Sequence, residues 1–139
     1  MSQFTLGQRL NNPLNIRYSK NNNWLGQIGS YRGFCEFESS DYGLRAAMLI
    51  IERYIVVYRK RFVRGIINRF APSVENNTEA YVRYVQTCLE RAGFDSNSPI
   101  EPYSDNFFSL VRSMAFYESK FYVSIDYLRD LVNKFHLDS

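Results

Sequence analysis

Glu118 is the residue of this chain whose type and position best fit acid–base chemistry. It lies in residues 105–121 (DNFFSLVRSMAFYESKF), and helical spacing places it on an apolar stripe. The apolar members of that stripe are Phe107, Leu110, Val111, Met114 and Phe121. Burial raises the pKa of a carboxyl group, and one that stays protonated near neutral pH can serve as a general acid. In the alternative, Glu118 pairs with an arginine and only helps to seal the core. Ion pairs of this kind also perturb pKa values, so a shifted pKa alone does not identify a catalytic group.

Glu75 is the second candidate carboxylate. It lies in the polar segment 71–78 (APSVENNT) between two expected helices, and loops of this kind often carry function. The alternative is a solvent-exposed residue that only supports a helix cap, since Asn76 and Glu79 have capping-box spacing. Glu36 and Glu38, in the expected hairpin, are weaker candidates for a second carboxylate.

The remaining reactive residues exclude most other chemistries. The chain has one histidine, His136, and two distant cysteines, Cys35 and Cys88. Zinc sites built on histidine pairs and Ser–His–Asp triads are therefore nearly excluded, and we expect buried free thiols. We expect neither a metal nor a cofactor, so the chemistry of this protein, if any, is carboxylate chemistry.

The elements that must position these residues form a mostly helical α+β domain. The 139 residues are 45% hydrophobic and 17% aromatic, enough for one domain with a core and no disulfides. Residues 1–12 read as an arm, and short strands at 14–18, 24–28 and 34–37 predict a small antiparallel sheet region, 12–37. Residues 39–136 form the expected helical region, with helices predicted at 41–61, 66–70, from about 77 to Gly93, from Asp105 to about 121, and after Ser124.

Charge and hydropathy bear on partners and location. The net charge is +3, and the densest basic run is residues 59–61 with Arg64 and Arg69 nearby. We interpret this run as a solvated helix end, so a nucleic acid is not the expected partner. The sequence shows no signal peptide and no membrane span, which predicts synthesis in the cytoplasm and no membrane contact. If the protein acts outside the cytoplasm, another system must deliver it.

Several short segments form an ordered set of motifs along most of the chain. They are 11–17 (NNPLNIR), 24–27 (WLGQ), 34–37 (FCEF), 42–46 (YGLRA), 67–73 (INRFAPS) with 75–81 (ENNTEAY), and Met114-Ala115 with Glu118. Together they resemble phage-type lysozyme-like proteins that degrade peptidoglycan. The resemblance implies a lysozyme-like fold and cleavage of glycan strands by a muramidase or lytic transglycosylase reaction. It also implies delivery to the periplasm or cell wall by a phage particle, lysis system or secretion apparatus.

The same resemblance suggests roles for individual residues. Glu118 would be the acid and Glu75 its partner, although a lytic transglycosylase needs only one carboxylate. The expected substrate-binding residues are Asn15, Arg17, Trp24, Gln27, Asn76 and Tyr117. Expected partners are the glycan strands of peptidoglycan, with an immunity protein or virion proteins as further possibilities, and we expect a monomer.

Related glucosaminidases and transglycosylases place a helix ending in Glu-Ser before the hairpin. Here residues 117–119 (YES) come after it, which predicts a circular rearrangement of the fold. The chain also departs from the usual motifs at Leu14, at Phe70 and at Ser119-Lys120, the last of which adjoins the proposed acid. A non-catalytic wall-binding or virion protein on the same scaffold is the alternative function.

Overall fold

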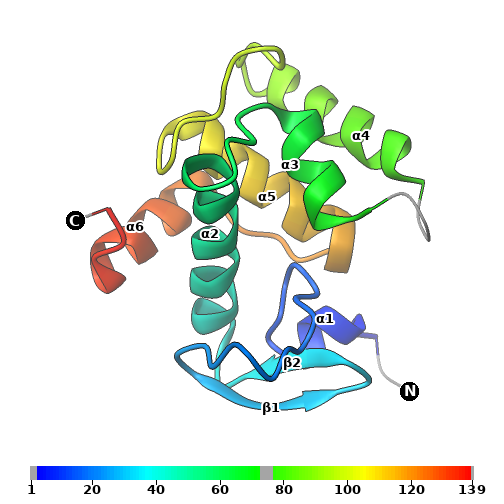
Figure 1. Cartoon of the computed structure of the whole chain (residues 1–139), viewed down its shortest axis with the longest axis vertical. Coiled ribbons are helices and arrows are strands. Elements are labelled where there is room, and N and C mark those ends of the chain that lie inside the picture. Colours follow the sequence, from blue (N-terminus) through cyan, green and yellow to red (C-terminus); the bar gives the residue numbers. More distant parts are fainter. Residues whose placement is uncertain (1–2, 73–76, 139) are drawn as a thin grey trace.

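The computed structural model describes residues 3–72 and 77–138. This described part is an α+β structure in which a two-stranded antiparallel sheet accompanies six helices. Figure 1 shows the sheet at one end, most helices at the other, and α2 running between them. The elements are α1 (Leu6–Arg9), β1 (Gln27–Tyr31), β2 (Phe34–Phe37), α2 (Ser40–Val56), α3 (Val63–Phe70), α4 (Thr78–Arg91), α5 (Asp105–Ser119) and α6 (Ile125–Phe135).

The hairpin is built on a two-residue turn. Arg32 and Gly33 both have positive φ, which matches the primed turns that suit the right-handed twist of the strands. Strand β2 has the predicted bounds, whereas β1 begins three residues later than predicted, at Gln27. The predicted strand at 14–18 is wrong: Arg17 alone forms a β-bridge, to Phe34, because the positive φ of Asn15 interrupts the extended backbone.

The loop that precedes the hairpin is held by a fully buried asparagine. The Asn12 side chain donates to the carbonyl oxygens of Ile16 and Cys35, at 3.0 and 2.9 Å, and accepts from the Ile16 amide at 2.8 Å. A buried amide group with all these partners fixes the loop against β2. The motif at residues 11–17 therefore has a structural role as well as any functional one.

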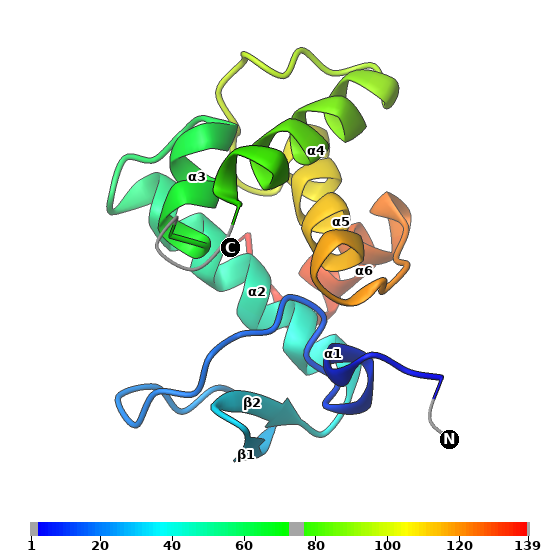
Figure 2. The ribbon, with the colours of Figure 1, turned by 90° about the vertical axis from the view of Figure 1, so that its right-hand side faces the viewer.

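The N-terminal segment is a short helix and not the predicted arm. Thr5 and Gln8 form a capping box at the start of α1. Thr5 Oγ1 and Gln8 Nε2 both donate to the carbonyl oxygen of Ser119, the last residue of α5. A Cβ at Gly7 would lie 1.9 Å from Ser119 Oγ, so glycine permits this close packing. Helix α1 thus lies against the end of α5 that carries Glu118 (Figure 2).

Helix α2 is the central helix, and it is shorter than predicted. It ends at Val56 instead of about Arg61, and Arg59 then adopts a positive φ as the chain turns toward α3. Only one face of α2 is buried, although the sequence of this helix is apolar almost all round. Val56 and Val57 are 57% and 52% exposed. Its buried residues join β2, α3, α4, α5 and α6 in one hydrophobic cluster.

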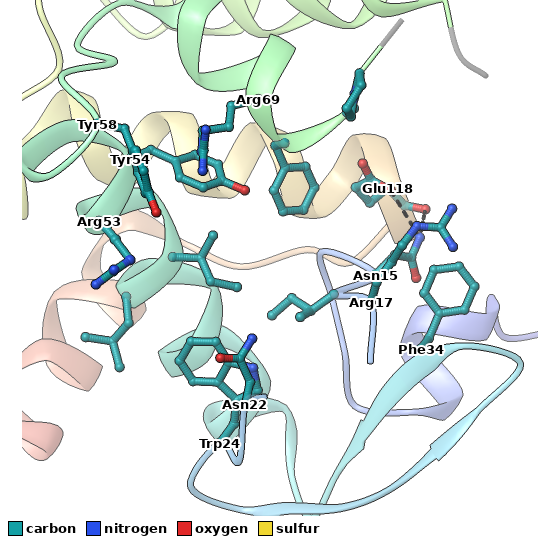
Figure 3. Close-up of a pocket in the computed structure, with 16 residues that line it drawn as sticks. Asn15, Arg17, Asn22, Trp24, Phe34, Arg53, Tyr54, Tyr58, Arg69 and Glu118 are labelled. Carbon is teal, nitrogen blue, oxygen red and sulfur yellow. Dashed lines mark hydrogen bonds between the residues drawn. The ribbon is translucent and has the colours of Figure 1, made fainter. Parts of the chain in front are cut away.

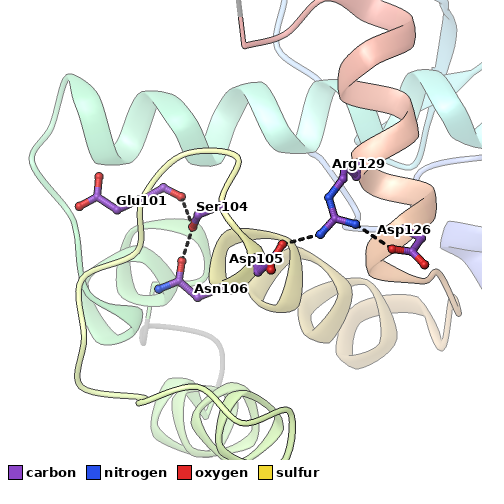
Figure 4. A network of polar contacts seen from close by, with 6 residues as sticks. All are labelled: Glu101, Ser104, Asp105, Asn106, Asp126 and Arg129. Atoms are coloured by element: carbon purple, nitrogen blue, oxygen red, sulfur yellow. Dashed lines mark hydrogen bonds and ion pairs between the residues drawn. The ribbon is translucent and has the colours of Figure 1, made fainter.

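One surface ion pair joins α5 to α6, and a second lies within α6. Arg129 of α6 contacts Asp105 at the start of α5, and its second nitrogen lies 2.7 Å from Asp126 (Figure 4). Exposed pairs of this kind add at most about 1 kcal/mol each. The position of α5 therefore depends mainly on apolar packing.

Within the described residues, no helix has the length and apolar character needed to cross a membrane.

Candidate functional site

A groove of about 810 Å³ separates the sheet region from helices α2, α3 and α5 (Figure 3). Five aromatic residues and three arginines line it, together with one carboxylate, Glu118. Its described lining residues are Asn15, Ile16, Arg17, Asn22, Trp24, Phe34, Leu49, Ile50, Arg53, Tyr54, Tyr58, Arg69, Phe70, Ala71, Pro72 and Glu118. Aromatic faces and fixed polar groups in one concave surface are typical of a ligand-binding site.

Glu118 lies at one end of this groove, one residue before the end of α5. Asn15 Nδ2 donates to its carboxylate Oε1 at 3.2 Å and to its main-chain oxygen at the same distance. Burial raises the pKa of Glu118 above its ordinary value of 4.5. The hydrogen bond from Asn15, the nearby Tyr81 hydroxyl and the charge of Arg17 oppose this rise without cancelling it. Glu118 therefore has the character of a carboxyl group that keeps its proton to higher pH.

Tyr81 of α4 forms the buried wall behind this carboxyl group. Its ring is 2% exposed, and burial together with the Glu118 charge raises the pKa of its phenol well above the usual value. Its hydroxyl lies near the Glu118 carboxyl but outside full hydrogen-bond geometry, and no other described group satisfies it. A neutral phenol in this position can donate to Glu118 once the carboxyl group loses its proton.

Asn15 reaches Glu118 because of its backbone conformation. Its φ of 54° lies in the left-handed region, which asparagine tolerates better than most residues. The buried Asn12 and the main-chain bond between the Cys35 amide and the Ile16 carbonyl hold the loop on either side. Arg17 follows in the same loop, with its guanidinium carbon 5.1 Å from the centre of the Phe34 ring. The loop before the hairpin thus places the Asn15 amide and the Arg17 cation beside the Glu118 carboxyl group.

The structure brings four of the predicted site residues together and separates two others. Glu118, Asn15, Arg17 and Trp24 line the groove, whereas Gln27 and Tyr117 are not among its lining residues. Gln27 accepts a hydrogen bond from the Trp24 amide at 3.2 Å, and so supports the start of the hairpin. Tyr117 stacks on Tyr81, with ring centres 3.9 Å apart.

Two predicted residues, Glu75 and Asn76, lie outside the described residues. The weaker carboxylate candidates, Glu36 and Glu38, do not belong to the lining of the groove. Glu118 is accordingly the one carboxylate among the described lining residues. The helix cap predicted at Asn76 is formed by Asn77, whose side chain accepts from the Ala80 amide.

Sequence reasoning missed the far end of the groove, which is lined by Arg53 and Tyr54 of α2, Tyr58 just after α2, and Arg69 of α3. A partial signal was present, because Leu49, Ile50 and Tyr54 extend the apolar character of α2 beyond its buried face. Ile50 and Tyr54 pack in part against the core, and all three side chains also line the groove. The basic run is divided: Arg64 pairs with Glu79 at 2.5 Å, and Arg69 turns into the groove.

No group of three or more metal-ligating side chains occurs in the part of the chain that the structure describes.

The chain is 39% identical over 83 residues to Protein P5 of Pseudoalteromonas phage PM2. The match covers 57% of this chain and 52% of that protein, so the chain spans about half the length of the curated relative it matches. No family model matches the chain. The chain is therefore similar to a phage protein.

Asn15 should set the protonation of Glu118. In Asn15→Gly the left-handed backbone remains accessible but the hydrogen bond that favours the charged carboxylate is lost, so the pKa of Glu118 should rise further. An NMR titration of the Glu118 side-chain carbon measures this directly. Asn22→Gly, which removes another amide from the groove lining, should leave that titration unchanged. A lower or unchanged pKa in Asn15→Gly would contradict this account of the site.

The half-buried carboxyl group of Glu118 should also make the free energy of unfolding depend on pH. Because the folded pKa of Glu118 exceeds 4.5, its favourable contribution is complete below that value and is lost as the pH rises through the folded pKa. Glu118→Gln removes this dependence. As the pH rises from acid to neutral, the free energy of unfolding of the variant should therefore increase relative to that of the wild type. Urea denaturation across this pH range measures the difference. A difference that is constant with pH would argue against a raised pKa.

Proposed function

We propose that this protein cleaves the glycan strand of peptidoglycan, with Glu118 as the general acid. The observation that carries the proposal is the position of Glu118: a half-buried carboxyl group with a raised pKa at the end of an aromatic-lined groove. Such a group can protonate the oxygen of the glycosidic bond as that bond breaks. The groove supplies ring faces for sugars, with Trp24 and Phe34 on the side of the sheet region.

The lining of the groove favours a single-carboxylate reaction. Two-carboxylate glycosidases place the second group roughly 5–5.5 or 6.5–9.5 Å from the acid. The described lining offers Glu118 alone, with Asn15 and the cation of Arg17 beside it. In the lytic transglycosylase reaction Glu118 gives its proton to the leaving oxygen. It then takes a proton from the substrate's own hydroxyl as that hydroxyl closes onto the sugar.

The chain order of the site supports a rearranged lysozyme-like fold. The helix ending in Glu118-Ser119 lies against the loop that leads into the hairpin, yet it comes some eighty residues after the hairpin in the sequence. Ser119 Oγ donates weakly to Asn15 Oδ1 at 3.4 Å, so both members of the Glu-Ser pair contact the same loop residue. In this proposal a late helix fills the place that an early one holds in related enzymes.

The similarity to a phage protein favours a role in a phage life cycle, with delivery to the cell wall by a particle or lysis system. In the alternative function the same groove binds glycan without cleaving it. The absence of a second carboxylate among the described lining residues is compatible with that alternative, and product analysis separates the two.

The experiment is digestion of purified peptidoglycan followed by mass spectrometry of the products. Anhydro-muramyl ends indicate the transglycosylase reaction, and reducing ends indicate hydrolysis with a second carboxylate elsewhere in the chain. Release by cleavage of peptide cross-links alone would refute the proposal. Glycan that is bound but left intact by the wild type would favour the non-catalytic function.

A further inference from the structure

The end of the groove opposite Glu118 carries a cluster of two arginines and two tyrosines. Arg53 and Tyr54 come from α2, Tyr58 from the segment just after α2, and Arg69 from α3 (Figure 3). The Arg69 guanidinium carbon lies 3.7 Å from the centre of the Tyr58 ring and 5.3 Å from that of Tyr54. The Arg53 guanidinium carbon lies 5.7 Å from the Tyr58 ring. We call these four residues the arginine–tyrosine cluster.

The charges of this cluster are not balanced within the described structure. Arg64 and Arg129 pair with carboxylates, but no described carboxylate oxygen lies within 4.0 Å of the guanidinium groups of Arg53 or Arg69. Glu118, the one carboxylate among the described lining residues, lies at the other end of the groove. Among the residues that the structure describes, this end of the groove therefore presents two cations without a counter-charge.

The aromatic rings hold the two guanidinium groups in orientations that suit a planar anion. A guanidinium group that lies over a ring is held in place while its N–H edge stays free to donate, and a carboxylate can accept two parallel bonds from that edge. Tyr54 adds a phenol whose pKa is raised by burial, so it remains a neutral O–H group. A neutral sugar ring would leave the charge of both arginines unmatched.

We propose that the arginine–tyrosine cluster binds the carboxylates of the peptide stems that branch from the peptidoglycan glycan strand. The proposal rests on the proposed function, because it takes the strand to lie in the groove with its cleaved bond at Glu118. The cluster then selects strands that carry free peptide carboxylates over neutral polysaccharides. Glu118 carries out the reaction, and Arg53 and Arg69 determine which glycan is held for it.

Binding to the Glu118→Gln variant tests this subsite without turnover. The probes are soluble uncross-linked peptidoglycan strands, the same strands with their carboxyl groups amidated, and a chito-oligosaccharide. Amidation should weaken binding about tenfold or more, as expected when charge-assisted hydrogen bonds are lost. Adding Arg53→Gln and Arg69→Gln should abolish the difference between the first two probes. A matched pair of substitutions on the exposed face of α4, Arg83→Gln and Arg91→Gln, should preserve it at the same net charge.

The outcomes separate the subsite from the general attraction of a basic protein and from the proposed function. Equal binding of native and amidated strands would overturn the subsite, as would an equal loss in the α4 control. Arg53→Lys with Arg69→Lys, which keeps the charges but not the planar forks, should show an intermediate preference, and thermal unfolding of each variant verifies its fold. If the wild type cleaves nothing but shows the same carboxylate preference, the subsite stands and the proposed reaction fails.

Discussion

Glu118→Gln should lower the rate of glycan cleavage by about 10²–10⁴-fold, the usual contribution of a positioned general acid. Glutamine keeps the shape of the side chain and can still accept the hydrogen bond from Asn15, but it has no proton to give to a leaving oxygen. Release of soluble fragments from labelled peptidoglycan measures the loss. The wild-type rate should also fall as the pH rises through the raised pKa of Glu118, because the acid form is then depleted.

The matched control for this variant is Glu38→Gln, which removes an exposed carboxylate from the segment after β2 without touching the groove lining. It should retain the wild-type rate. Glu118→Gln should remain folded and bind glycan, since its buried amide replaces a carboxylate that burial already disfavours. Comparable rates for wild type and Glu118→Gln would remove Glu118 from the reaction.

Gly43→Ala should destabilise the fold by about 3 kcal/mol, the upper part of the range for overpacked sites. Gly43 lies in α2, where alanine is normally the better helix former. An added Cβ would sit 2.1 Å from the carbonyl oxygen of Asn11 and 3.0 Å from Pro13 Cδ. The loop that carries Asn15 would have to move away from α2, so glycan cleavage should fall as well. Urea denaturation gives the free energy of unfolding.

Gly65→Ala is the internal control, because it makes the same substitution in helix α3. There the added Cβ would meet nothing closer than Lys60 Cδ at 3.5 Å, an ordinary van der Waals contact. The change should stabilise the protein by about 0.5–1 kcal/mol through helix propensity and a less flexible unfolded chain. If both variants lost stability equally, a general intolerance of alanine would replace the explanation based on the Asn11 contact.

Local patterns in the sequence predicted those elements whose signals are local. The short segment 34–37 was predicted as a strand and forms β2, and the helix predicted after Ser124 begins there, with the Tyr127 amide donating to Ser124 Oγ. Helix α1 was missed although Thr5 and Gln8 have capping-box spacing, because a glycine in a four-residue helix argues against it. Its stability comes from Ser119, which lies more than a hundred residues away in the chain.

In the candidate site, too, the sequence identified residues with local signals but not the contacts between distant segments. The apolar stripe of α5 identified Glu118 as a carboxylate at the edge of the core, and the motif at 11–17 identified Asn15 and Arg17 as candidates. That Asn15 donates to Glu118 depends on a left-handed backbone and on contacts between distant segments, which spacing does not encode. The arginine–tyrosine cluster needs α2 and α3 to meet at the groove, so it became visible only in the folded chain.

The central claim is that Glu118 breaks the glycan strand held in the groove. The most direct measurement incubates peptidoglycan strands of known length with wild type or Glu118→Gln, and then determines the bound fraction and the strand length of the same sample by mass spectrometry. We expect shortened strands with new glycan ends from the wild type, and bound strands of full length from the variant. Full-length strands with both proteins, or shortened strands with both, would contradict the claim.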